Sequence, residues 1–257
     1  MTPLSVVIIT YNEEKNITRC MQSVMPIADE VVVLDSFSTD RTAVIVQELG
    51  GVFHQQAFEG YGAQKNAAAA LASYDHILFL DADEALSEQL CKSIRQEKWQ
   101  GFPQNGYLMN RLNNYMGQWI RHGSWYPDRK LRLADRRKSA WSLDIVHESL
   151  VPDKNARIGL LSGDLLHYTY TSYDDHVDKN NRYSRLSAQL LFERGKKATW
   201  FKLAFNPFWA FFTSYFLRAG FLDGFNGFVI AVHIGHLTFL KYSKLYLLRS
   251  EKQVANK

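Results

Sequence analysis

A chain of 257 residues is long enough for one large domain, or for one domain with a helical appendage. Apolar residues make up 46% of it, enough for a sizeable core, which excludes an intrinsically disordered protein. The formal net charge of +4 suits an anionic diphosphate ligand or an anionic membrane surface. We expect no nucleic-acid partner, because the basic residues are scattered, without a zinc-ligand spacing or a helix-turn-helix signature.

The first third of the chain alternates between strand-like and helix-like segments. Apolar runs predict strands at residues 4–9, 31–34, 52–54 and 77–80. Apolar residues at helical spacing predict a helix with one buried face after the first strand (Ile17, Cys20, Met21 and Val24), and residues 63–73 predict an alanine-rich helix. This alternation predicts an α/β fold with a mainly parallel sheet. No basic segment typical of a signal peptide precedes the first strand, so we expect a cytoplasmic location.

Polar side chains follow three of these strands, where ligands of parallel sheets bind. They are Thr10, Tyr11 and Asn12 after the first strand, Asp35 after the second, and Asp81 and Asp83 after the fourth. Asn12 is also placed to cap a helix that starts with Glu13 and Glu14. Asp35 can accept a hydrogen bond from a nucleobase or a ribose, and the alternative is an Asx-type cap of the next helix.

Asp81 and Asp83 form the sharpest candidate site. Two acids two positions apart, directly after a buried strand, can bind one divalent cation whose remaining ligands are substrate phosphates. This pattern predicts Mg²⁺ or Mn²⁺, which would neutralise charge on a departing diphosphate. His167 can be a third metal ligand, although a lone histidine in a strand is also typical of a protein core.

Three basic residues are candidates for contacts with a diphosphate. Lys65 lies at a predicted helix start, where phosphate binding is favoured, and the alternative is a surface lysine. Lys130 and Arg132 lie on one face of a predicted strand at residues 130–133 and can share a diphosphate. The alternative for this strand is a solvated sheet edge.

The last quarter of the chain is aromatic and carries few charges. A polar helix is expected at residues 172–195, after a short strand at 160–168. Residues 203–217 and 224–240 then contain no charged side chain, but both runs are shorter than the roughly 20 apolar residues of a spanning helix. Aromatic rings beside basic residues favour a pair of helices lying in the membrane interface. A buried helical hairpin or a dimer contact is the alternative.

Three segments near the N-terminus together resemble the family 2 glycosyltransferases: SVVIITYNEE (5–14), DSFSTDRT (35–42) and LDADE (80–84). Further segments look like the subgroup of lipopolysaccharide core β-glucosyltransferases: QKN (64–66), WYPDRKLRL (125–133), VHE (146–148), HYTY (167–170) and GFLDG (220–224). The resemblance covers nearly the whole chain.

This resemblance implies a GT-A, Rossmann-like fold, a nucleotide-sugar donor such as a UDP-sugar, and inversion at the anomeric carbon. It places Thr10, Tyr11 and Asp35 at the nucleoside, and Asp81 and Asp83 on the metal-binding motif. Many family members have a second acid after the position of Asp35, where this chain has Ser36. The Gln-x-x-Arg-Trp signature of processive synthases is absent, so we expect one sugar per encounter.

An inverting transfer needs a carboxylate that takes a proton from the acceptor hydroxyl. Glu148 is the first candidate for this base, with Asp128 and Asp144 behind it; the Glu-Asp pair usual in the family is not obvious here.

We therefore expect a catalytic domain at 1–195, with a nucleotide-sugar half at 1–105 and an acceptor half at 106–195, followed by amphipathic aromatic helices at 196–257. The leading hypothesis is transfer of a single hexose, glucose first, to a glycolipid such as the lipopolysaccharide inner core, on the cytoplasmic face of a bacterial inner membrane. Two alternatives stay open: transfer to a polyprenyl phosphate, and a catalytically silent nucleotide-sugar binding protein on the membrane.

Overall fold

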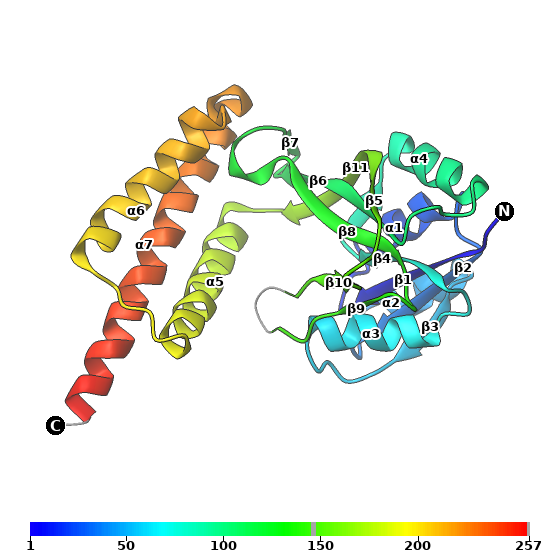
Figure 1. The fold of residues 1–257 in the computed structure, drawn as a ribbon, viewed down its shortest axis with the longest axis horizontal. Coiled ribbons are helices and arrows are strands. Elements are labelled where there is room, and N and C mark those ends of the chain that lie inside the picture. Colours follow the sequence, from blue (N-terminus) through cyan, green and yellow to red (C-terminus); the bar gives the residue numbers. More distant parts are fainter. Residues whose placement is uncertain (145–147, 256–257) are drawn as a thin grey trace. The chain divides into compact units, whose positions relative to one another are not determined.

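The computed structural model describes residues 1–144 and 148–255, and the side chains of 1–144 and 148–251. The chain forms two compact units, which we call the sheet unit (1–112 and 128–168) and the helical unit (113–127 and 169–257). The functional division expected at residue 195 stays a prediction. Figure 1 labels the α-helices and strands: β1 (Leu4–Thr10), α1 (Ile17–Val24), β2 (Glu30–Asp35), α2 (Thr42–Glu48), β3 (Val52–Gln55), α3 (Tyr61–Leu71), β4 (His76–Asp81), β5 (Glu84–Leu86), α4 (Glu88–Trp99), β6 (Gly106–Tyr115), β7 (Gln118–Ile120), β8 (Asp128–Asp135), β9 (Ser139–Trp141), β10 (Leu150–Pro152), β11 (Ile158–Tyr170), α5 (Tyr173–Glu193), α6 (Trp200–Phe212) and α7 (Gly224–Ala255). Three short helical turns complete the described elements: η1 (Gly123–Trp125), η2 (Thr213–Leu217) and η3 (Gly220–Asp223).

The sheet unit is built on a mixed sheet in the order β3-β2-β1-β4-β8-β6-β11-β5. The four strands predicted from the apolar runs, β1 to β4, are present and pair in parallel. Strands β8, β6 and β5 continue the sheet in antiparallel pairings. The fold class expected from the sequence, an α/β GT-A fold with C-terminal aromatic helices, is confirmed.

Both faces of β1 are buried, which explains its unbroken apolar run. Val6 and Ile8 pack into one core cluster with α1 and α4, whereas Val7 and Ile9 pack into a second cluster with α3. Because successive side chains of a strand point to opposite faces, a strand covered on both sides needs apolar residues at every position. The four apolar residues predicted to form one face of α1 are all buried.

One predicted helix start is wrong. Asn12 does not cap a helix, because α1 begins at Ile17 with Asn16 as its N-cap residue. Asn12 instead has a φ of 54°, in the left-handed region that asparagine tolerates better than most residues. Its side-chain oxygen accepts from the backbone N–H of Thr39, at a distance of 2.8 Å. The segment therefore forms a loop before the helix.

The helical unit consists mainly of α5, α6 and α7. Helix α5 begins where the polar helix was predicted, and the Ser172 hydroxyl caps it by accepting from the N–H of Asp175. The buried Asp223 carboxylate, just before α7, accepts from the N–H of His122 at 2.8 Å. Gly227 faces Gly220 so closely that a Cβ there would lie 1.9 Å from the Gly220 carbonyl oxygen. Small residues therefore fix the entry into α7.

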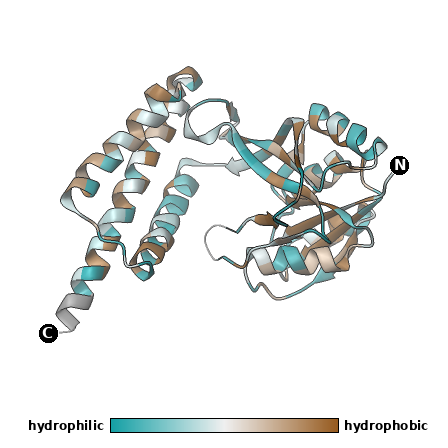
Figure 2. Ribbon diagram, in the orientation of Figure 1, coloured by the Kyte–Doolittle hydropathy of each residue, from teal (hydrophilic) through white to brown (hydrophobic). Residues whose placement is uncertain are grey.

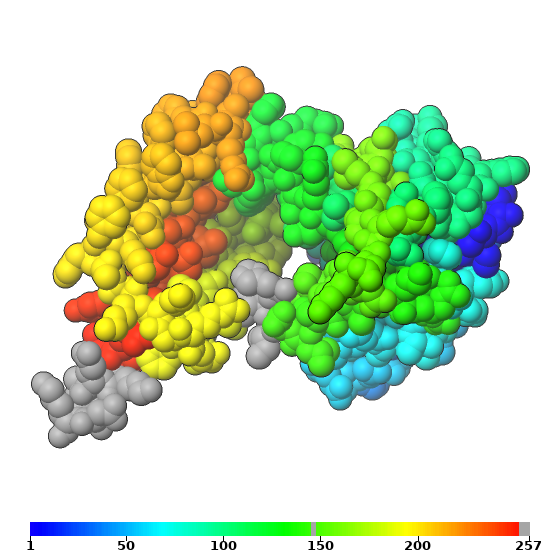
Figure 3. Space-filling view, in the orientation of Figure 1, coloured from blue at the N-terminus to red at the C-terminus, as the bar shows by residue number. Residues whose placement is uncertain are grey.

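Helix α6 is strongly apolar (Figure 2), yet none of its residues is buried. The rings of Phe201, Phe205 and Trp209 stack along one side at centroid distances of 5.0 and 6.0 Å. Figure 3 shows the side chains of α6, yellow to orange, on the surface of the helical unit. No helix among the described residues is both long and apolar enough to cross a membrane.

Candidate active site

Three strand ends bring the predicted polar residues of the sheet unit to one edge. Thr10 pairs with Asp35 in the parallel register of β1 and β2, and Ile9 pairs with Asp81 in that of β1 and β4. Thr10 is buried, and its hydroxyl has no hydrogen-bond partner among the described residues. Tyr11, the next residue, is 59% exposed. This edge therefore offers an unused polar atom beside an accessible ring.

Asn12 and Asp35 connect the loops that follow β1 and β2. The backbone N–H of Asn12 donates to the Ser38 hydroxyl at 2.7 Å, and the Asn12 side chain accepts from Thr39. The fully buried Asp35 carboxylate accepts from the Ser38 N–H at 2.7 Å and from the Gln55 amide at 3.2 Å. The carboxylate thus stabilises its own turn, as in an Asx-type arrangement, and its contact with a nucleoside stays a prediction.

Asp81 lies between two buried cations. Its Oδ1 is 3.0 Å from Lys65 Nζ, and its Oδ2 is 2.8 Å from Arg132 Nη2. Although desolvation by burial alone would raise it, the charges of Lys65 and Arg132 hold the pKa of the Asp81 carboxyl well below its ordinary value. Asp81 is therefore ionised at any physiological pH.

A third acid, Glu84, contacts both Arg132 and the backbone of Asp81. It is fully buried, and its Oε1 lies 3.0 Å from Arg132 Nη2 and 3.8 Å from Arg111 Nη1. Its Oε2 accepts from the backbone N–H of Asp81 at 3.0 Å. Burial alone would lower the pKa of Arg132, but the charges of Glu84 and Asp81 raise it well above its ordinary value. The Nε and Nη1 atoms of Arg132 are buried and lack a hydrogen-bond partner among the described residues.

Lys65 is 2% exposed, so the alternative of a surface lysine is wrong. Besides Asp81, its Nζ lies 3.8 Å from Glu148 Oε1 and 4.4 Å from the ring centroid of Trp141. Lys65 therefore stands between the strand-end acid and the candidate base. Of the motif at 146–148, only Glu148 belongs to the described residues; Val146 and His147 lie outside them.

The second base candidate, Asp128, is already paired on both oxygens. Its Oδ2 accepts from Arg111 Nε at 3.0 Å and Nη2 at 2.8 Å, and its Oδ1 lies 3.1 Å from Lys130 Nζ. Burial opposes these charges, but Arg111 and Lys130 lower the pKa of Asp128. A carboxylate stabilised in this way is a weak proton acceptor. Lys130 is partly exposed, unlike Arg132, which follows it on the same strand face.

Asp83 and His167 approach each other, with His167 Nε2 3.3 Å from Asp83 Oδ2. Strand pairing causes this proximity, because His167 is the register partner of Glu84. Within residues 1–144 and 148–251, no group of three or more histidine, cysteine, aspartate or glutamate side chains is arranged to hold a metal ion. The oxygens of Asp81 and Asp83 nevertheless suit Mg²⁺ or Mn²⁺ in type, since both cations prefer few carboxylate ligands completed by substrate phosphates.

Sequence reasoning missed three contributors: Glu84, Arg111 and Trp141. Glu84 had a signal, because it follows the acid pair directly in a buried segment. Arg111 had none, since its contact with Asp128 arises from the antiparallel register of β6 against β8. Trp141 had none either, since its ring contacts Lys65 and Arg132, which come from two other elements.

Known proteins match this chain both in sequence and in fold. The sequence profile of glycosyl transferase family 2 matches residues 5–151. An uncharacterised glycosyltransferase of Rickettsia typhi is 34% identical, over 95% of this chain and 87% of its own. The lipopolysaccharide core biosynthesis glycosyltransferase LpsC of Rhizobium meliloti is 32% identical, over 95% of this chain and 92% of its own. A mannosyltransferase of Pyrobaculum calidifontis, solved with GDP-mannose and Mn²⁺, has a similar fold: its TM-score is 0.59 at 15% identity, over 95% of this chain and 87% of the other.

Proposed function

The chain belongs to the family 2 glycosyltransferases, and we propose that it transfers one hexose, with glucose the first candidate, from a UDP-sugar to a membrane-associated glycolipid such as the lipopolysaccharide inner core. The observation that carries this proposal is the position of Lys65. A buried cation that joins a strand-end acid to a second carboxylate, Asp81 to Glu148, is suited to couple a leaving diphosphate with a general base.

The donor diphosphate is proposed to bind at Lys65 and Arg132, with Lys130 at the rim. Buried N–H groups without a partner are costly, so the free Nε and Nη1 of Arg132 favour an anionic ligand in this place. The nucleoside would then lie along the edge formed by Thr10, Tyr11, Asn12 and Asp35. The unpartnered Thr10 hydroxyl supports this placement.

Asp81 and Asp83 would hold Mg²⁺ or Mn²⁺, with His167 beside them. When bound, the cation supplies Lewis-acid stabilisation of the charge on the departing diphosphate. Asp81 is held ionised by Lys65 and Arg132, so its carboxylate is available for this ligation. The Mn²⁺ named with the similar mannosyltransferase supports the same proposal.

Glu148 is proposed to act as the general base. It takes the proton from an acceptor hydroxyl while that oxygen attacks the anomeric carbon of the donor sugar. The bond from the anomeric carbon to the diphosphate oxygen breaks, and its electron pair leaves with the nucleoside diphosphate. Attack from the face opposite the leaving group inverts the anomeric configuration.

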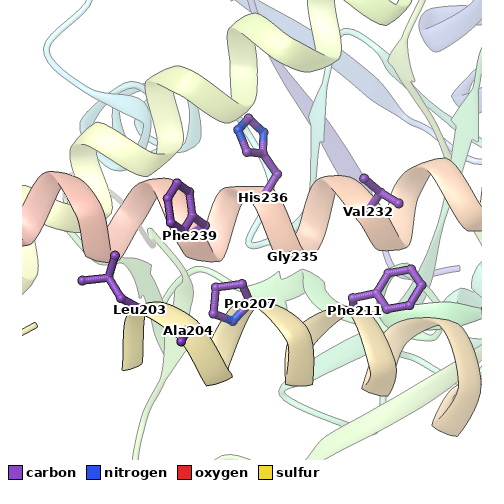
Figure 4. Close-up of a pocket in the computed structure, with 8 residues that line it drawn as sticks. All are labelled: Leu203, Ala204, Pro207, Phe211, Val232, Gly235, His236 and Phe239. Atoms are coloured by element: carbon purple, nitrogen blue, oxygen red, sulfur yellow. The ribbon is translucent and has the colours of Figure 1, made fainter. Parts of the chain in front are cut away.

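We propose that the helical unit holds the enzyme at the cytoplasmic face of the inner membrane. An apolar groove of about 520 Å³ lies between α6 and α7, lined mainly by aliphatic and aromatic side chains (Figure 4). Gly235 lets the two helices approach closely, since a Cβ there would lie 3.0 Å from the Pro207 carbonyl oxygen. The wholly unburied α6 supports an apolar environment beyond the protein.

The test is transfer by the purified protein from radiolabelled UDP-glucose to lipopolysaccharide truncated to its inner core. We expect a product heavier by one hexose, and loss of product in excess chelator or in Asp83→Asn. Ser162→Ala, at an exposed serine of β11, is the control and should retain activity. Absence of product with this acceptor would overturn the acceptor assignment, and full activity in chelator would overturn the metal assignment.

A further inference from the structure

The hairpin strand β9 is fastened to helix α3 by a two-point hydrogen bond. The Asn66 side-chain oxygen accepts from the backbone N–H of Trp141 at 2.9 Å, and its amide donates to the Trp141 carbonyl at 2.9 Å. One side chain therefore fixes both backbone groups of one residue. An asparagine in the middle of a helix is otherwise neutral to unfavourable, so this contact accounts for its presence.

Gly62, one helical turn before Asn66, makes the second contact. The Ser142 carbonyl lies so close that a Cβ on Gly62 would be 2.0 Å from its oxygen, a distance that real structures do not show. Gly62 and Asn66 occupy positions i and i+4, which lie on one face of a helix. This face of α3 therefore receives the chain at Trp141 and Ser142.

The segment held by Gly62 and Asn66 is also hydrogen-bonded to the residue next to the proposed base. Ser142 donates its N–H to the Ser149 carbonyl at 2.9 Å, and its hydroxyl accepts from the Ser149 N–H at 3.2 Å. Glu148 is the residue before Ser149, so its backbone begins at a point tied through Ser142 to α3. Lys65, between Gly62 and Asn66 on the same helix, lies 3.8 Å from the Glu148 carboxylate.

We propose that Gly62 and Asn66 are positioning residues that hold Glu148 in register with Asp81 and Lys65. This inference rests on the proposed function, because it takes Glu148 as the base. Neither residue touches the donor or the acceptor in this proposal. They act through the backbone at Trp141, Ser142 and Ser149, and a displacement of about 1 Å at a reacting group can cost on the order of 10²-fold in rate.

The test compares kcat with donor Kd in Asn66→Ala and Gly62→Ala. We expect kcat to fall by at least about tenfold, and towards about 10²-fold, while the Kd of UDP stays within about twofold. Asn66→Asp keeps the acceptor for the Trp141 N–H and should recover part of the loss. Ala70→Gly, at an exposed position of α3, weakens the helix without this contact and should leave kcat unchanged.

A double-mutant cycle with Glu148→Gln distinguishes the positioning role of Asn66 from the base role of Glu148. If Asn66 acts through Glu148, Asn66→Ala should lower kcat no further in the Glu148→Gln background. A multiplicative loss in the double variant, a normal kcat in Asn66→Ala, or a matching loss of UDP binding would overturn the positioning role. If Glu148→Gln itself is fully active, the base assignment fails instead.

Discussion

Glu148 is the residue on which the proposed chemistry depends most directly. Glu148→Gln keeps the size of the side chain and one acceptor oxygen but cannot take the proton of the acceptor hydroxyl, so kcat should fall by roughly 10²–10⁴-fold. Donor affinity should change little, because the substitution leaves Lys65 and Arg132, the proposed diphosphate contacts, in place. Steady-state kinetics beside calorimetric titration with UDP measures both quantities.

Asp153→Asn is the matched control, since Asp153 is an exposed acid directly after β10 and has no part in the proposed site. It should leave kcat within about twofold. An unchanged kcat in Glu148→Gln together with a weaker Kd would move Glu148 to a binding role and make Asp128 the next candidate, despite its pairing with Arg111 and Lys130.

At the residue scale, the sequence could place a side chain whose location is set by a single strand. It could not place a side chain whose location depends on contacts between several elements. Asp81 and Asp83 could be placed because they directly follow a buried strand, and the ends of parallel strands meet at one edge. The burial of Lys65 could not be predicted, because Lys65 contacts Asp81 of β4 and Trp141 of β9, which are distant from it in the sequence. From the sequence alone, Lys65 could be either a phosphate ligand or a surface lysine.

At the scale of elements, α5 and α7 enclose a buried pair of histidines. The rings of His176 and His233 stack at a centroid distance of 4.0 Å; His176 Nδ1 lies 3.0 Å from the Tyr115 hydroxyl, and Asn180 Nδ2 lies 2.8 Å from His233 Nδ1. Burial, then the neighbouring His233 and Lys179, lower the pKa of His176 from 6.5 to about 3. Burial and His236 also lower the pKa of His233. Both shifts favour the neutral imidazole in the folded protein.

This arrangement predicts that the helical unit loses stability in mild acid. Between about pH 6.5 and about pH 3 the unfolded chain protonates His176 and the folded chain does not, so protons favour unfolding. The free energy of unfolding should fall by up to about 1.4 kcal/mol per pH unit from this residue. Urea unfolding of the full chain between pH 7.5 and pH 5 measures the slope. This slope of the unfolding free energy against pH should be shallower in His176→Phe than in the parent protein. His54→Gln, which removes a histidine of β3, is the control and should keep the parent slope. Equal slopes in all three proteins would contradict the lowered pKa of His176.

Sequence patterns predicted those elements whose burial is complete or one-sided. The strands β1, β2 and β4 were found because both of their faces are covered, and α1 because its apolar residues form one stripe. The start of α1 was misplaced because Asn12 fits two roles: it can cap a helix, or adopt the left-handed conformation that a tight loop needs. The antiparallel strand β5 is only three residues long, so no periodicity could indicate it.

At the scale of the whole molecule, α6 presents a large apolar surface that the described residues leave uncovered. Trp200, Phe201 and Phe208 are 80%, 69% and 62% exposed, which is far more apolar surface than an isolated solvent-facing helix usually presents. Lys196, Lys197 and Arg218 are exposed near its two ends. Aromatic rings beside basic side chains match the headgroup region of an anionic bilayer.

We therefore predict that the full-length protein floats with vesicles made of equal parts phosphatidylglycerol and phosphatidylethanolamine. Each basic residue near the surface should contribute about 1 kcal/mol at low salt, so binding should weaken as salt screens the charges. Trp209→Glu, on the exposed side of α6, should reduce flotation further, because a carboxylate would enter the apolar layer. Trp99→Glu, which removes an equally bulky exposed ring from α4 in the sheet unit, should not. If the parent protein stays in the unbound fraction at low salt, or if the two variants behave alike, α6 is covered by protein, as in a dimer contact, and the membrane assignment is wrong.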